Sequence, residues 1–116
     1  MTSIKLASAG IRVPVAVGDL LIIRGVNESG GFAMALPDDE VMATRDAIAK
    51  QEGLLLCPEG AATAAAYKRA LAEGKISVDD TAVLFNCATG LKYPMAPVDN
   101  HLDKNEPVDY SSFGPR

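Results

Sequence analysis

The sequence predicts a small α/β domain, with a mainly parallel sheet of three or four strands and helices on its faces. Two observations lead to this fold class. Between residues 30 and 93, short apolar runs are each followed by Pro or Gly and then by a helix-compatible segment. More than fifteen residues separate successive runs, which suits helical crossovers between parallel strands. Together they indicate right-handed βαβ units.

The chain length and composition favour one globular domain with one core. For 116 residues and 12.1 kDa, about 6,000 Å² should stay exposed out of about 17,500 Å² in the unfolded chain. Apolar residues make up 48 % and aromatic residues 5 % of the sequence. This composition excludes a disordered acidic chain, a collagen-like chain and a disulfide-dense scaffold.

Charge and cysteine usage exclude several classes of partner. Eleven Lys and Arg against fifteen Asp and Glu give a net charge of -4, so we expect neither nucleic acid nor a membrane as partner. The longest apolar stretch, Leu20–Ile23, is far shorter than the roughly 20 residues of a membrane span, which favours a cytoplasmic protein. Cys57 and Cys87 form no CxxC motif, and there is one His, so we expect two reduced thiols and no metal site.

The first thirty residues allow two interpretations. Val13–Val17 and Leu20–Ile23 are rich in β-branched residues, yet a helix from about Val15 to Ser29 also fits. Gly30 and Gly31 are suited to cap the end of such a helix, which favours the helical interpretation.

The next segment predicts a strand and then a helix. Phe32–Leu36 is the expected strand, and the helix should run from about Asp39 to Gln51, before Gly53. Acidic residues are expected to supply the N-cap and first turn of this helix: Asp38, Asp39 and Glu40. The residues expected on its inner face are Val41, Thr44, Ala47 and Ile48. The residues expected to point elsewhere are Arg45, Asp46, Lys50 and Glu52.

A second strand and helix follow, and then a third strand. Leu54–Cys57 is the second expected strand, and Pro58 begins an Ala-rich helix that should extend to about Gly74. Thr81–Cys87 is the third expected strand. Residues 94–116 show no periodicity and contain four prolines, so we divide the chain into an α/β region, 1–93, and an irregular tail.

Ligands of an open parallel sheet bind beyond the carboxyl ends of its strands, close to helix N-termini. Two segments occupy such places, residues 57–63 and residues 86–92. Neither matches a phosphate loop or a dinucleotide-binding fingerprint.

Three segments carry a family resemblance. They read GIRVPVAVGDLLIIRGVNESGG, EGLLLCPEGAATAAAYKRALAEG and VLFNCATGLKYP. In this order, and over about residues 9–94, they resemble the C-terminal part of threonine synthase, a pyridoxal 5′-phosphate enzyme of the tryptophan-synthase-β-like fold. The resemblance implies that the complete enzyme converts O-phospho-L-homoserine to L-threonine and phosphate. It also implies that the predicted sheet is part of that fold's larger domain.

The resemblance assigns cofactor-binding candidates. The family's strand-end Ser or Thr, which meets the pyridine nitrogen, corresponds to Cys87, although a thiol is a weaker hydrogen-bonding group and Ala88 stands where the family usually has Gly. Thr89 and Gly90 would lie near the ring, and Glu59 is a secondary candidate. Structural roles are the alternative: a small buried thiol at Cys87, turn chemistry at the next two sites and a first-turn acid at Glu59.

No catalytic residue is assigned. The family's Gly-rich phosphate loop has no counterpart in this sequence. None of the lysines matches the family's Schiff-base motif; they are Lys5, Lys50, Lys68, Lys75, Lys92 and Lys104. We therefore expect a fragment or truncated paralogue that is inactive and binds no pyridoxal 5′-phosphate by itself. The alternatives are a non-catalytic binding or assembly module and a single domain of a longer chain. Apolar faces at Val15–Val26 and Ala61–Ala72 predict a homo-oligomer, most simply a two-fold dimer.

Overall fold

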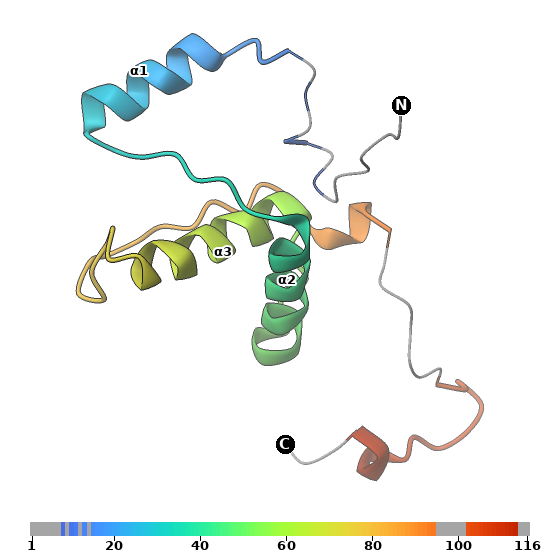
Figure 1. Cartoon of the computed structure of the whole chain (residues 1–116). Coiled ribbons are helices and arrows are strands. Elements are labelled where there is room, and N and C mark those ends of the chain that lie inside the picture. The colour runs from blue at the N-terminus through green and yellow to red at the C-terminus, as the bar shows by residue number, and fades with distance from the viewer. Residues whose placement is uncertain (1–7, 9, 12, 14, 95–101, 114–116) are drawn as a thin grey trace.

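The structure, a computed structural model, describes residues 8, 10–11, 13, 15–94 and 102–113. Its elements are α1 (Asp19–Ser29), α2 (Asp38–Glu52), α3 (Pro58–Ala72), η1 (Gly90–Lys92) and η2 (Tyr110–Phe113). Helices α2 and α3 pack against each other at a steep angle, and α1 lies apart from both (Figure 1). The expected tail is described only at residue 94 and over 102–113, and the expectation for Lys5 lies outside the described residues.

Helix α2 confirms the predicted helix, with different details at its start and on its buried face. Pro37 is the N-cap residue, so the prediction of an acidic N-cap is wrong, because no side chain caps this helix. Gly53 ends it with φ of 68°, a left-handed conformation that glycine adopts without strain. Arg45, expected to point outward, is buried, and its guanidinium bonds to Asp46 at 2.9 Å.

Helix α3 confirms the predicted Ala-rich helix and supplies most of the core. Pro58 occupies its first turn, where a missing N–H costs nothing. Its buried apolar side chains are small: Ala61, Ala64, Ala65 and Ala70. These short side chains permit close packing. Arg69 adds polar links, because it pairs with Glu40 of α2 and donates to the Ala35 carbonyl at 3.2 Å.

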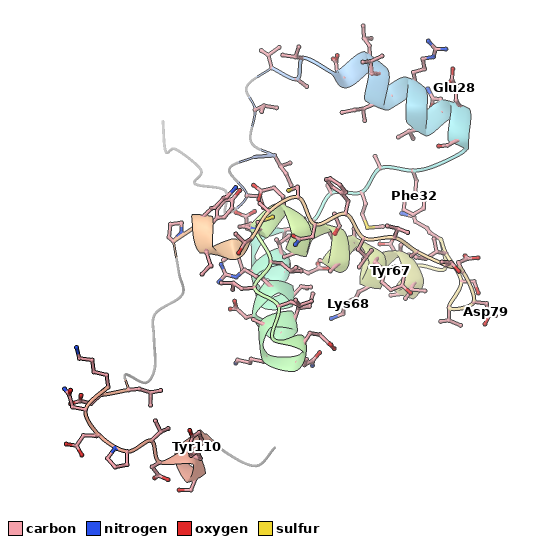
Figure 2. The ribbon with its side chains drawn as sticks, turned by 180° about the vertical axis from the view of Figure 1, so that it is seen from behind. Glu28, Phe32, Tyr67, Lys68, Asp79 and Tyr110 are labelled. Atoms are coloured by element: carbon pink, nitrogen blue, oxygen red, sulfur yellow. The ribbon has the colours of Figure 1, made fainter. Side chains whose placement is uncertain are left out.

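Helix α1 confirms the helical interpretation of the first thirty residues, although it begins at Asp19 rather than near Val15. Gly30 ends it with φ of 65°, and Gly31 N donates to the Val26 carbonyl at 2.9 Å. None of its residues is buried, and Leu20 is 78 % exposed. Figure 2 shows this helix, with Glu28 labelled, held away from α3. Residues 30–37 form the linking segment between α1 and α2. Phe32 lies on this segment, and the Lys75 ammonium nitrogen is 5.4 Å from the centre of its ring.

The predicted parallel sheet is wrong. Phe32–Leu36, Leu54–Cys57 and Thr81–Cys87 form no strands, and the β-bridge found among the described residues joins Leu56 to Thr89 in antiparallel fashion. A strand needs a partner backbone along its length, and local apolar pattern does not supply one. Residues 31–37 instead pass over α3 toward α2, and residues 81–88 run beside α3 (Figure 1).

The described structure is more open than the mass predicts. Its accessible surface is 9554 Å², whereas about 6,000 Å² is typical of a compact protein of this size. The radius of gyration is 17.9 Å, against about 13 Å for a compact chain of this length. Large apolar side chains such as Val83 and Phe85, 91 % and 75 % exposed, remain uncovered.

The Ala-rich packing of α3 gives a stability prediction. Replacing the buried Ala65 by Leu should overpack the core and lower the free energy of unfolding by about 1–3 kcal/mol, measured by urea titration of helical circular dichroism. Ala72→Leu, at the exposed end of the same helix, is the matched control and should change it by less than about 0.5 kcal/mol. Equal midpoints for the two variants would contradict the packing described.

Candidate functional site

The candidate site is the contact between residues 55–60, which lead into α3, and residues 86–93. We call this contact the α3 junction. Gly90 N donates to the Leu55 carbonyl at 2.9 Å, and Cys57 N donates to the Ala88 carbonyl at 3.3 Å. With the Leu56–Thr89 bridge, these bonds join two segments that α3 and a loop separate in the sequence.

Two glycines lie where the two segments of the α3 junction approach most closely. A Cβ atom at Gly90 would lie 2.6 Å from the Leu56 carbonyl oxygen, and one at Gly60 would collide with the Asn86 amide oxygen. Neither glycine has a positive φ. Close approach of the two backbones therefore requires glycine at position 90, whereas at position 60 the exposed Asn86 side chain can turn aside.

The thiols of Cys57 and Cys87 meet at the α3 junction. Cys57 is fully buried and caps α3, with its Sγ accepting from Gly60 N at 3.2 Å. The two Sγ atoms are 3.7 Å apart, and Cys57 Sγ lies 3.7 Å from Asn86 Oδ1. Because the Cys57 hydrogen can be donated to Asn86, the Cys87 S–H is left to donate to Cys57 Sγ.

The alternative interpretation of Cys87 as a buried thiol is wrong, because its side chain is exposed. The hydrogen bond with Cys57 raises the pKa of the Cys87 thiol, and desolvation and the nearby Glu59 carboxylate add to the rise. At neutral pH, Cys87 therefore presents a neutral thiol to solvent.

Glu59 links three parts of the chain. Its Oε1 accepts from Gly10 N at 2.7 Å, and its Oε2 accepts from the Tyr93 hydroxyl at 2.7 Å. Partial burial raises the pKa of Glu59, but the hydrogen bonds from Tyr93 and from backbone N–H groups outweigh this effect and leave the pKa below its usual value. The same bond raises the pKa of Tyr93 to about 12.

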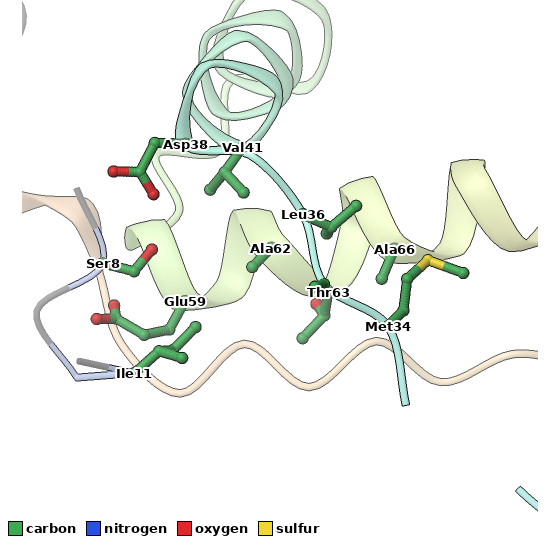
Figure 3. Close-up of a pocket in the computed structure, with 11 residues that line it drawn as sticks. Ser8, Ile11, Met34, Leu36, Asp38, Val41, Glu59, Ala62, Thr63 and Ala66 are labelled. Carbon is green, nitrogen blue, oxygen red and sulfur yellow. The ribbon is translucent and has the colours of Figure 1, made fainter. Parts of the chain in front are cut away.

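A cavity of about 480 Å³ lies against the first half of α3, beside Glu59 (Figure 3). Its walls are mainly apolar, with Met34 and Leu36 from the linking segment and Ala62 and Ala66 from α3. The charged lining residues are the carboxylates Asp38 and Glu59, and none of the lining residues is cationic. This volume suits a small molecule, and the acidic lining disfavours an anionic one.

The predicted site residues lie around the α3 junction but on two sides of it. Cys87, Thr89 and Gly90 belong to the segment that docks on α3, whereas Glu59 faces the cavity. Thr89 accepts from Leu91 N at 3.3 Å, as the first residue of a turn often does. Whether any of the four contacts a cofactor stays a prediction.

Sequence reasoning did not identify Gly10, Gly60, Asn86 or Tyr93 as site residues. Tyr93 lies 34 residues from Glu59 in the sequence, and no local sequence pattern predicts a hydrogen bond between residues so far apart. Asn86 and Gly60 stand inside the two segments already expected to meet ligands, and their adjacency is visible only once the segments are docked.

The part of the chain that the structure describes contains neither a candidate metal centre nor a candidate membrane span. No cluster of three or more His, Cys, Asp or Glu side chains that could hold a metal ion occurs among the described residues. Within the same ranges, no helix has the length and apolar character needed to cross a membrane.

Comparison with known proteins relates this chain to threonine synthases. It is 31 % identical to the threonine synthase of Methanocaldococcus jannaschii over 91 residues, which are 78 % of this chain and 22 % of that protein. It is 29 % identical to the threonine synthase of Methanosarcina acetivorans over 92 residues, 79 % of this chain and 23 % of that protein. The chain thus spans less than a quarter of the curated relatives it matches. No family model and no solved structure matches it.

The bond between Tyr93 and Glu59 can be tested by alkaline titration of tyrosinate absorbance. Tyr93 should ionise near pH 12, and Tyr93→Phe should remove that step. Glu59→Gln should lower the Tyr93 pKa toward about 10, because the acceptor loses its negative charge. A Tyr93 titration unaltered by Glu59→Gln would mean that the two side chains do not interact in solution.

Proposed function

We propose that this chain forms part of a threonine-synthase-like enzyme that converts O-phospho-L-homoserine to L-threonine and phosphate with pyridoxal 5′-phosphate. The observation that carries the proposal is the similarity to two threonine synthases over 78–79 % of the chain. The chain's contribution is the wall that carries Cys87 toward the pyridine edge of the cofactor. Since less than a quarter of each relative is matched, the remaining parts of the active site come from elsewhere in the enzyme.

The described residues fit one edge of this cofactor. Cys87 is exposed and neutral at physiological pH, and its thiol replaces the hydroxyl that the family places at the ring nitrogen. A neutral partner leaves the ring nitrogen without the carboxylate that would favour its protonation. Cys87 would thus orient the ring by turning its S–H from Cys57 Sγ to the ring nitrogen, and it would add no charge to the ring.

The same residues do not fit the cofactor's phosphate. The start of α3 is closed, because Gly60 N is bonded to Cys57 Sγ and the Glu59 carboxylate stands in the first turn. The cavity beside it is acidic. A phosphate dianion would be repelled at both places. We therefore expect this chain to bind no pyridoxal 5′-phosphate alone.

The exposed apolar surface supports a role within a larger body. Helix α1 buries none of its residues, and Val83 and Phe85 stand out into solvent. Large exposed apolar surfaces are normally covered by another part of a protein. In a threonine-synthase-like subunit, the remaining polypeptide would cover them.

A chimeric enzyme tests the proposal. Residues 9–94 should replace the matching segment of a threonine synthase and support threonine formation, which is measured as released phosphate. The isolated chain should show neither activity nor a cofactor absorption band. In the chimera, Cys87→Ala should lower kcat about fivefold, equivalent to one neutral hydrogen bond, and Cys87→Ser should not. A chimera that binds the cofactor and responds equally to both substitutions would argue against a role for Cys87.

The second candidate function is a non-catalytic module that assembles with itself. It is favoured by the apolar side chains of α1, among which Leu20 and Ile22 are largely exposed. A two-fold dimer is the commonest way to cover such a surface. Light scattering should then give a dimer mass, and a monomer at high concentration would rule out this candidate.

A further inference from the structure

The α3 junction holds two thiols in contact with each other, one exposed and one buried. Cys87 is exposed and can be reached by a small oxidant, whereas Cys57 is fully buried beneath it. Their Sγ atoms are 3.7 Å apart and need to approach to about 2.05 Å to bond. The backbone bond from Cys57 N to the Ala88 carbonyl already keeps the two segments adjacent.

We propose that Cys57 and Cys87 form a redox-active dithiol, which a hydroperoxide oxidises to an intramolecular disulfide. The Cys87 thiolate attacks the peroxide oxygen, which gives a sulfenic acid at Cys87 and releases an alcohol, or water when the oxidant is hydrogen peroxide. The Cys57 sulfur then attacks the Cys87 sulfur, the S–S bond forms and water leaves. Two thiols are oxidised and one peroxide bond is reduced, so atoms and electrons balance.

The assignment of the two roles follows from exposure and reach. Only Cys87 is open to solvent, so it meets the oxidant first, and Cys57 is the nearest nucleophile to the sulfenic acid. Contact with Cys57 and the nearby Glu59 carboxylate keep Cys87 mostly protonated at neutral pH. Oxidation should therefore be slow at neutral pH and accelerate as the pH rises, because the thiolate is the form that attacks the peroxide.

Oxidation would alter the α3 junction in two ways. The disulfide would link the two segments covalently across a separation of 30 residues, and Gly60 N would face a disulfide sulfur instead of a thiol. A third consequence, which lies outside the junction, rests on the proposed function: the Cys87 thiol would no longer be free for the cofactor ring. Oxidation would then switch that contact off, and a dithiol reductant would restore it.

The test uses the full chain, without cofactor, and hydrogen peroxide as the oxidant. We expect both free thiols to be lost together, the intact mass to fall by two hydrogen atoms, and a non-reduced digest to contain a peptide pair linked through Cys57 and Cys87. Dithiothreitol should reverse all three changes. Because no cofactor is present, the result is independent of the threonine synthase assay, and failure of either proposal leaves the other intact.

Single substitutions separate the two roles. Cys57→Ser should leave a sulfenic acid at Cys87 that dimedone traps, whereas Cys87→Ser should leave a buried Cys57 that peroxide does not modify until the chain is unfolded. Helical circular dichroism checks that both variants fold. A disulfide between two chains, or further oxidation of Cys87 while Cys57 stays a free thiol in the unsubstituted protein, would overturn the proposal.

Discussion

The docking of residues 86–93 against the start of α3 is the interaction on which the rest of the site depends. It consists of two backbone hydrogen bonds and one β-bridge, and the two backbones approach so closely at Gly90 that no side chain fits there. Without it, Cys87 would not reach Cys57, and Tyr93 would not reach Glu59. Glu59 extends the same contact to the N-terminal segment through Gly10. One short interface therefore brings together the two thiols and the Glu59–Tyr93 pair.

The core beneath this interface is modest. Most of the buried apolar side chains on α3 are alanines, each of which removes little more than a methyl group from water. Hydrogen bonds and ion pairs between segments consequently carry a larger share of the cohesion, as Arg69 shows by joining α3 both to Glu40 and to the linking segment. The larger apolar side chains, on α1 and at residues 83–85, contribute almost nothing to the core described.

The sequence was informative where structure is decided locally. Pro37, Pro58 and the glycines at 30 and 53 mark helix ends through their own backbone preferences, and all three helices were predicted within a few residues. The prediction of a sheet was wrong, because an apolar run indicates a preference for burial but does not specify which other backbone segment pairs with it. The family resemblance places Cys87, Thr89 and Gly90 near a cofactor ring, which stays a prediction, and it gives no indication that they dock against the start of α3. The bond between Tyr93 and Glu59 was beyond prediction, since it depends on docking two segments.

The collision that a Cβ atom at position 90 would cause with the Leu56 carbonyl oxygen has an evolutionary consequence. A backbone carbonyl cannot turn aside as the exposed Asn86 side chain can at position 60, so a change at position 90 has no simple compensation. In proteins descended from this chain, position 90 should stay glycine for as long as the two segments stay docked. Its loss would mark lineages in which they have separated.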